Sequence, residues 1–182
     1  MNETKVTTGI VRLSYANIWE PKAGKDDVRE KYSTAILIPK KDTKTIEAIK
    51  VAIEEAKQAG VAKLGGKIPN NLKVPLRDGD TDDAADGKEV YAGHYFINAS
   101  SVTAPGIVDR NRKEILDREE VYSGCYCVVS LNFYAYNGEK SKGIAAGLNN
   151  IMKVKDGERL DGRTSAEEDF KDVVLDDDDD IL

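Results

Sequence analysis

The amino-acid sequence predicts a mainly β protein, a small five-stranded barrel with one inserted helix, followed by an acidic tail that does not fold. Three observations lead to this prediction. Short β-branched runs bounded by turn residues recur along the chain, one segment alone has the apolar spacing of a helix, and residues 167–182 are strongly acidic. The 182 residues suit one domain, predicted over residues 1–166, with the tail over 167–182.

The first two strands are expected at residues 6–13 (VTTGIVRL) and 31–38 (KYSTAILI), where β-branched and aliphatic residues dominate. The polar connection between them contains Pro and Gly and is predicted to be a loop. Aromatic and basic residues gather in and after this loop: Tyr15, Trp19, Lys22, Lys25, Arg29 and Lys31. Rings that stack on bases, next to cations that contact phosphates, favour a groove for single-stranded nucleic acid. For Trp19 a buried structural role is an equal alternative.

Residues 43–59 are predicted to form the helix, because Ile46, Ile49, Ile53 and Ala56 recur at spacings of three and four. Asp42 or Thr43 can cap its start, and Gly60 follows its end. The next segment, residues 60–89, is rich in Gly, Pro, Asn and Asp and is predicted to be a long loop.

The acidic part of this loop, residues 78–89, has the spacing of a calcium-binding loop. Its acids at the ligand positions are Asp78, Asp80, Asp82, Asp86 and Glu89. The sixth position, which needs Gly for a sharp turn, is Asp83, so a solvated acidic loop is favoured over a cation site.

The second half of the chain is predicted to be β. Residues 90–100 (VYAGHYFINAS) indicate a strand, an irregular crossing follows, and Asn137-Gly138 indicates a type I′ hairpin turn. Alternation before this turn gives a core face, formed by Cys125, Cys127, Val129, Leu131, Phe133 and Ala135. The opposite face carries Tyr122, Tyr126, Tyr134 and Tyr136. Among Ser and Asn neighbours these tyrosines can stack on bases, and packing across strands is the alternative for each.

No catalytic, metal or cofactor site is predicted. His94 with Cys125 and Cys127 would supply at most three zinc ligands on two strands, and the two cysteines are better explained as small core residues. In GVAKLGGK the residue after Gly65 is Gly66, so the phosphate-loop pattern fails. The start of the chain lacks an apolar targeting segment, and no stretch approaches the ~18 apolar residues of a membrane span. A cytoplasmic, non-enzymatic protein with no membrane partner is therefore expected.

Charge is divided unequally along the chain. Residues 167–182 contain nine acids and one base, a net −8, which leaves 26 bases and 24 acids, a net +2, in residues 1–166. The chain ends in Asp176, Asp177, Asp178, Asp179, Asp180, Ile181 and Leu182. Such a tail cannot bury enough apolar area to fold. We expect it to compete with nucleic acid for a basic groove and, once displaced, to bind replication proteins of the phage or host.

About five strands with one inserted helix suit a partly open Greek-key barrel of the OB type, with a small mixed α+β sheet as the alternative. Five blocks resemble a family of phage-encoded single-stranded DNA-binding proteins with this fold, formerly known as a domain of unknown function. The blocks are SYANIWEP, AILIPKKD, YFINASSVTAPGIVD, EVYSGCYCVVSLNFYAYN and KGIAAGLNNIMKVKDGERL. The resemblance spans about residues 6–170 and extends in plan to the single-stranded DNA-binding proteins of short-tailed coliphages.

The resemblance implies sequence-tolerant binding of single-stranded DNA in phage replication or recombination, no catalysis, and a homodimer. In the coliphage relatives the tail ends in an aromatic residue, whereas here it ends in Ile181-Leu182. The alternative function is an acidic protein-interaction factor, either a DNA mimic or a recombination mediator, whose body does not coat DNA.

Overall fold

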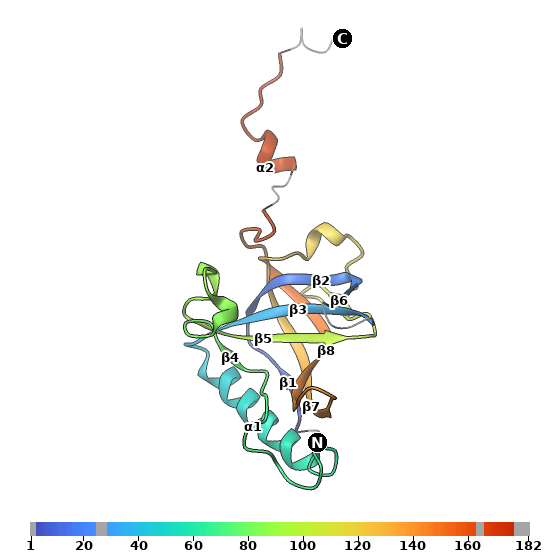
Figure 1. Cartoon of the computed structure of the whole chain (residues 1–182). Coiled ribbons are helices and arrows are strands. Elements are labelled where there is room, and N and C mark those ends of the chain that lie inside the picture. The colour runs from blue at the N-terminus through green and yellow to red at the C-terminus, as the bar shows by residue number, and fades with distance from the viewer. Residues whose placement is uncertain (1–2, 25–28, 163–165, 177–182) are drawn as a thin grey trace.

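A computed structural model describes residues 3–24, 29–162 and 166–176 (Figure 1). Five long strands are β2 (Val11–Ala23), β3 (Glu30–Pro39), β5 (His94–Ser101), β7 (Tyr126–Asn137) and β8 (Lys142–Lys155). Three short strands are β1 (Lys5–Thr7), β4 (Arg77–Asp78) and β6 (Gly106–Val108). The helices are α1 (Thr43–Ala59) and the short α2 (Ala166–Phe170), and 3₁₀ turns lie at Asp83–Ala85, Glu89–Tyr91 and Arg118–Glu120.

The five long strands form a ring in the order β7-β2-β3-β5-β8, which β8 closes by pairing with β7. Two of its ladders are short: β2 meets β7 at Val11 and Arg12, and β5 meets β8 in parallel at Ala99 and Ser100. The ring is therefore a partly open barrel, and the predicted five-stranded architecture is confirmed. The short strands β1, β4 and β6 extend the sheet to eight strands.

The helix α1 begins and ends at the predicted residues. Asp42 caps its start, because its carboxylate accepts a hydrogen bond of 3.2 Å from the Thr45 N–H. Its apolar stripe is buried and packs against β7, so α1 covers the lower end of the barrel in Figure 1. After the helix, Gly60 passes so close to β7 that an added Cβ would lie 2.3 Å from the Ala135 Cβ. Close approach therefore requires Gly here.

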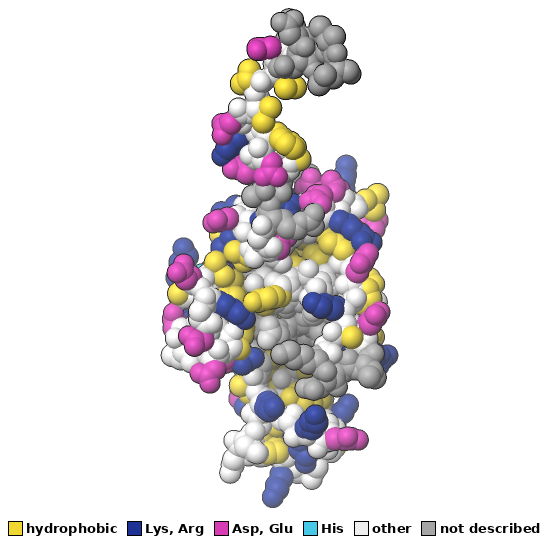
Figure 2. Space-filling model, turned by 45° about the horizontal axis from the view of Figure 1, so that its top comes forward, with side chains coloured by type: hydrophobic (Ala, Val, Ile, Leu, Met, Phe, Trp, Pro, Cys, Tyr) yellow, Lys and Arg dark blue, Asp and Glu magenta, His cyan; other side chains and the backbone are white. Residues whose placement is uncertain are grey.

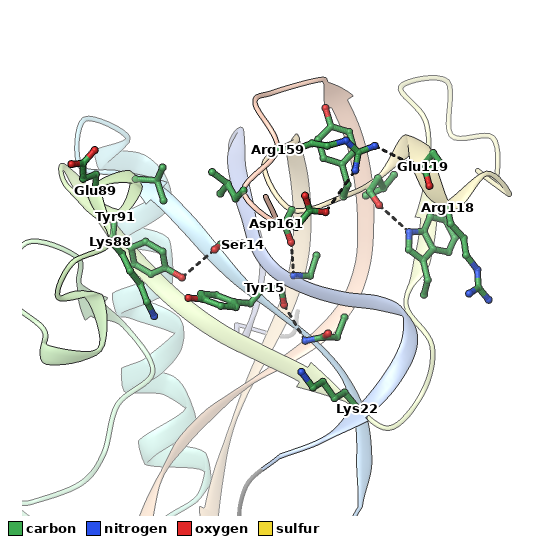
Figure 3. A pocket seen from close by; sticks show the side chains of 18 of the residues that line it. Ser14, Tyr15, Lys22, Lys88, Glu89, Tyr91, Arg118, Glu119, Arg159 and Asp161 are labelled. Carbon is green, nitrogen blue, oxygen red and sulfur yellow. Dashed lines mark hydrogen bonds and ion pairs between the residues drawn. The ribbon is translucent and has the colours of Figure 1, made fainter. Parts of the chain in front are cut away.

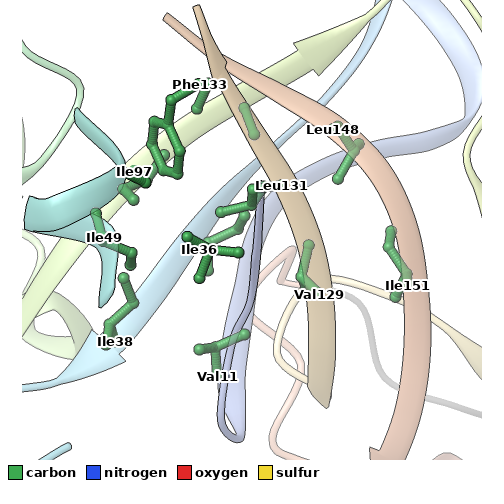
Figure 4. Close-up of a cluster of buried hydrophobic side chains, with 14 of the residues drawn as sticks. Val11, Ile36, Ile38, Ile49, Ile97, Val129, Leu131, Phe133, Leu148 and Ile151 are labelled. Atoms are coloured by element: carbon green, nitrogen blue, oxygen red, sulfur yellow. The ribbon is translucent and has the colours of Figure 1, made fainter. Parts of the chain in front are cut away.

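The predicted core face of β7 is confirmed. Its alternate residues from Cys127 to Ala135 are buried, as is Cys125, and they pack against side chains of β2, β3, β5 and β8 (Figure 4). Cys125 and Cys127 are free and buried, with sulfur atoms 3.5 Å apart. They fill space in the core, as small apolar residues do.

The prediction that a loop connects the first two strands was wrong over its first half. Instead β2 continues to Ala23, and its polar end pairs with β3 through Asn17↔Ser33 and Lys22↔Lys31. Two register shifts interrupt this ladder, one between Ser14 and Asn17 and one between Asn17 and Lys22. They break the alternation by which a strand is recognised in a sequence.

The hairpin between β7 and β8 is confirmed, but its type I′ turn was wrong. Asn137 is the last paired residue, opposite Lys142, and the four-residue loop 138–141 is closed by a hydrogen bond of 2.9 Å from the Gly138 N–H to the Ser141 carbonyl. Neither Asn137 nor Gly138 has a positive φ. The Asn137 amide instead donates to the Lys63 carbonyl at 3.1 Å, which anchors the segment after α1 to the hairpin.

The tail extends away from the barrel in Figure 1. Its described residues, 166–176, are all exposed, and only Ala166–Phe170 are helical. Asp177, Asp178, Asp179, Asp180, Ile181 and Leu182 lie outside the described residues. Across the described ranges, no helix is both long enough and apolar enough to span a membrane.

Burial on α1 leads to a stability prediction. Ile49 is fully buried and Val51, on the opposite side of the same helix, is 56% exposed. Ile49→Ala should lower the free energy of unfolding by about 2–5 kcal/mol, because it leaves a cavity, whereas Val51→Ala should change it by about 0.5 kcal/mol or less. Urea unfolding measures both, and equal effects would contradict the packing of α1 on the barrel.

Candidate nucleic-acid interface

Two adjoining hollows lie over β2, and we call the two together the groove. The first, of about 820 Å³, is lined by β2, the 3₁₀ turn before β5, the segment 118–123 and the segment 159–161 (Figure 3). The second, of about 400 Å³, is lined by the end of β2, by Arg29 and β3, and by Ser100 of β5. Asn17 and Lys22 line both hollows, so the two are continuous.

Tyr15 is the most exposed aromatic side chain of the groove, with 59% of its surface accessible. It sits in the first register shift of β2, where the three steps from Ser14 to Asn17 oppose only two steps on β3. Its φ of 48° is left-handed, a conformation that costs a non-glycine residue roughly 1–3 kcal/mol. Its ring lies at the groove surface, where the Lys88 ammonium lies 4.7 Å from the ring centroid. Backbone strain at an exposed aromatic residue favours a binding role.

Trp19 lies in the second irregular stretch of β2 and forms part of the groove wall. Its Nε1–H donates a hydrogen bond of 2.9 Å to the Val121 carbonyl, and its ring packs partly against the main core. The hydrogen bond and the packing give Trp19 a structural role, and stacking of a base on its ring stays a prediction.

The arginines of the first hollow are paired with carboxylates. Arg118 contacts Glu20 at 2.7 Å, and Arg159 contacts Glu119 at 2.9 Å and Asp161 at 3.7 Å. The Arg118–Glu20 pair is exposed on both sides, so it stabilises the fold little and can be exchanged for another anion. The Arg159 side chain is only 19% exposed, so a phosphate could replace the carboxylate more readily at Arg118 than at Arg159.

Tyr122 is fixed at the back of the first hollow. Its hydroxyl donates to the Gly157 carbonyl at 2.9 Å and accepts from the Gly157 N–H at 3.1 Å. The Arg159 guanidinium lies 4.3 Å from its ring centroid, and burial raises the pKa of its phenol. Tyr122 thus orients Arg159, and its ring is engaged before any ligand arrives.

The structure brings together only some of the predicted site residues. Tyr15, Trp19, Lys22, Arg29, Lys31 and Tyr122 line the groove. Tyr126, Tyr134 and Tyr136 line neither of its hollows. Tyr126 lies between Arg12 and Lys155, at 5.4 and 5.0 Å, whereas Tyr134 and Tyr136 lie near the far end of β7. Lys25 lies outside the described residues.

Sequence reasoning missed Lys88, Tyr91, Arg118 and Arg159, which also line the first hollow. Lys88, Arg118 and Arg159 come from segments that show no strand or helix period, and Tyr91, in the predicted strand 90–100, lies instead in the 3₁₀ turn before β5. Their neighbours in the groove are distant in sequence. The Tyr91 hydroxyl, for example, donates to the Ser14 Oγ at 3.3 Å across 77 residues. Only the aromatic and basic residue types could have indicated them.

Three carboxylates of the acidic loop before β5 are paired with basic side chains of the chain itself. The Lys40 ammonium lies 2.7 Å from both Asp78 and Asp80, and Arg77 makes two bonds of 2.8 Å to Asp82. These hydrogen bonds raise the pKa of Lys40 and lower the pKa values of the three carboxyls. The described residues contain no group of three or more His, Cys, Asp or Glu that could hold a metal. The calcium alternative therefore has no support.

The chain matches a family model described as "Enterobacter phage Enc34, ssDNA-binding protein" over residues 4–182. It is 32% identical to "Putative protein p50" of Acyrthosiphon pisum secondary endosymbiont phage 1, over 98% of each chain. Among solved structures, the single-stranded DNA-binding protein of bacteriophage Enc34 in complex with ssDNA has a TM-score of 0.75 at 26% identity, covering 86% of this chain and 89% of that one. The bacteriophage T7 protein gp2.5 has a TM-score of 0.62 at 18% identity, covering 91% and 99%, which shows the same fold.

Because its backbone is strained, replacing Tyr15 by glycine should not lower the free energy of unfolding, as a glycine in a strand usually does. Tyr15→Gly should leave the free energy of unfolding unchanged or raise it by up to ~1 kcal/mol, because Gly adopts a left-handed φ without a steric cost. The matched change Tyr134→Gly, at an exposed residue in a regular part of β7, should lower it by roughly 1 kcal/mol. Thermal and urea unfolding test this, and a marked loss of stability in Tyr15→Gly would show that the bulge is not strained.

Proposed function

This chain belongs to the Enterobacter phage Enc34 single-stranded DNA-binding protein family, and from this premise we propose that it binds single-stranded DNA along the groove. The observation that carries the proposal is Tyr15, whose exposed ring stands on a backbone with a left-handed φ, in a groove that Lys22, Arg29 and Lys31 also line. The Enc34 protein, whose structure has been solved with ssDNA, has a TM-score of 0.75 to this chain.

The chemistry of the groove favours binding without sequence preference. Every base has a π-face, so a base can stack on Tyr15 whatever its identity. Lys22, Lys31 and Lys88 supply charge to phosphates, which carry no sequence information. Arg118 can then exchange its exposed carboxylate partner, Glu20, for a phosphate. Binding in this way requires no covalent step from any of these residues, so the function we propose is binding and not catalysis.

The acidic tail is proposed to compete with DNA for the groove and, when displaced, to bind replication proteins. Its start lies at the groove wall, because Ala166 and Glu167 line a hollow together with Tyr122 and Arg159. Its described acids are exposed, and so are four apolar residues among them: Phe170, Val173, Val174 and Leu175. Action in phage replication or recombination, in the host cytoplasm and as a homodimer, stays a prediction.

The alternative function is an acidic interaction factor that acts as a DNA mimic or a recombination mediator without coating DNA. Both functions assign a role to the acidic tail. In the alternative, no nucleic acid binds in the groove. A titration with oligo(dT), followed by the fluorescence of Trp19 and the tyrosines, separates the two functions. The absence of both fluorescence quenching and a gel shift at low salt would favour the alternative.

Tyr15 gives a sharp test of DNA binding. Tyr15→Gly should weaken oligo(dT) binding by roughly 1–3 kcal/mol, the value of one stacking contact, while the protein stays folded. Tyr15→Phe, which retains the ring, should bind within about twofold of the original chain. The dissociation constants are measured by fluorescence anisotropy. Unchanged binding by the glycine variant would remove Tyr15 from the interface.

Removal of the tail gives a second test. A chain of residues 1–166 loses a net charge of −8, so its affinity for oligo(dT) should rise at low salt, and the gain should shrink as salt screens the charges. The matched control, Ile181→Ser with Leu182→Ser, keeps every charge and should leave DNA affinity unchanged while weakening capture of replication proteins in pull-downs. Equal affinities of the truncated and full chains at every salt concentration would contradict competition.

A further inference from the structure

A turn rich in cations follows β6, close to one end of the groove. Residues 109–113 form this turn, which is closed by a hydrogen bond of 2.9 Å from the Asp109 N–H to the Lys113 carbonyl. We call it the basic turn, because its exposed side chains include Arg110, Arg112 and Lys113. Arg118, which lines the groove, follows Lys113 by five residues, so the two lie at most about 18 Å apart.

The cations of the basic turn are not paired within the chain. Among the described residues, none of the three takes part in an ion pair. The carboxylate of the turn, on Asp109, instead accepts hydrogen bonds from the main-chain N–H groups of Asn111 at 2.8 Å and Lys113 at 3.0 Å. The turn is therefore shaped by its own backbone, and its cations are available to an anionic partner.

The acidic loop, residues 78–89, lies at the other end of the groove. Figure 1 shows the loop after β4 on the left of the barrel and β6 on the right, and Figure 3 shows Lys88 and Arg118 on opposite sides of the first hollow. Several Asp and Glu side chains are visible on the left flank in Figure 2. Besides its three paired carboxylates, the loop has three exposed ones that make no ion pair among the described residues: Asp83, Asp86 and Glu89.

These unpaired carboxylates border a hollow of about 470 Å³, which shares Gly87, Lys88 and Glu89 with the groove. The one cation among the residues that line it, Lys88, lies against the rings of Tyr15 and Tyr91, at 4.7 and 5.5 Å. The hollow is thus anionic at the point where it joins the groove, and it repels the phosphates of a strand that leaves the groove there. A cationic partner in the hollow removes this repulsion.

From this arrangement we propose that the basic turn of one copy docks on the acidic loop of the next copy, so that copies on one DNA strand contact each other head to tail. The two surfaces lie on opposite flanks of the barrel, so they meet between chains and not within one (Figure 1). Such a heterologous contact repeats along the strand without closing, unlike the isologous contact of a homodimer.

This contact rests on the proposed function, because DNA in the groove brings the copies together, and it goes beyond it by naming a protein surface for each side. Both surfaces adjoin the groove, so two copies on one strand hold them at a high effective concentration. Exposed ion pairs are weak by themselves. The contact should therefore form on DNA, and the free chain should not polymerise.

A short and a long oligonucleotide separate binding from contact between copies. Oligo(dT) of about eight nucleotides suits one OB fold, and oligo(dT) of about forty holds several copies. The full chain should bind the short ligand in a simple one-site manner. On the long ligand a bound neighbour should raise the affinity of the next copy by about fivefold or more at low salt, and the effect should shrink as salt rises. Fluorescence anisotropy and gel shifts measure both.

Charge reversal tests the two surfaces together. The turn variant is Arg110→Glu with Lys113→Glu, which spares Arg112 because of its left-handed φ of 66°. The loop variant is Asp83→Lys with Asp86→Lys. Each variant alone places like charges between neighbouring copies, so each should lose the cooperativity. The chain with all four changes keeps the net charge of −6 and should regain it, as should an equimolar mixture of the two variants, in which every contact joins opposite charges.

A matched control removes the same charge elsewhere. Lys44→Glu with Lys50→Glu changes two exposed lysines of α1 and should retain the cooperativity. Affinity for the short oligonucleotide is measured for every variant, so that a direct effect on DNA binding is seen separately. Equal losses in the turn variant and the α1 control would contradict a specific contact.

The remaining outcomes distinguish the inference from the proposed function. One-site binding to the short ligand without cooperativity on the long one would overturn the inference and retain the proposed function. No binding of the full chain to either ligand would overturn both. Cooperativity that the turn variant loses, and that neither the four-change chain nor the mixture regains, would overturn the inference in favour of a basic turn that contacts DNA.

Discussion

The pairing of β7 is the constraint on which the rest of the structure depends. This strand pairs with β1, β2 and β8, and α1 packs against it. Since side chains alternate with a period of two, a slip of one residue would expose the buried set from Cys127 to Ala135 and bury the tyrosines. The barrel can therefore close in one register only, and that register separates Tyr126 from Tyr134 and Tyr136.

Strain in β2 shapes the groove. A regular strand would turn alternate residues into the core, and the two register shifts of β2 interrupt that pattern at Tyr15 and Trp19. Tyr15 is left exposed with a left-handed φ, and Trp19 is tied to Val121 at the wall. The same irregularity that weakens the β2–β3 ladder thus makes an aromatic surface on which bases of single-stranded DNA can stack.

Charge is arranged differently in the groove and at the hairpin end of the barrel, where β7 and β8 are joined. In the groove, carboxylates occupy the arginines, so a nucleic acid must displace an anion that is already present. At the hairpin end Lys73, Lys140 and Lys142 make no such pairs among the described residues. Salt weakens contacts of exposed charges such as Arg118 most, and it screens the less exposed Arg159 less.

The sequence by itself determined the features that depend on local periodicity and composition. The bounds of α1, the core face of β7, the number of long strands and the charge difference between body and tail follow from residues close together in the chain. The second half of β2 does not. The tertiary structure alone decided what depends on distant partners. Asn137 serves as an anchor for Lys63 instead of a turn residue, and Arg159 reaches the groove because Tyr122 and Glu119 hold it there. Side chains that meet across many residues leave no period in the sequence, so their arrangement emerges only when the barrel closes.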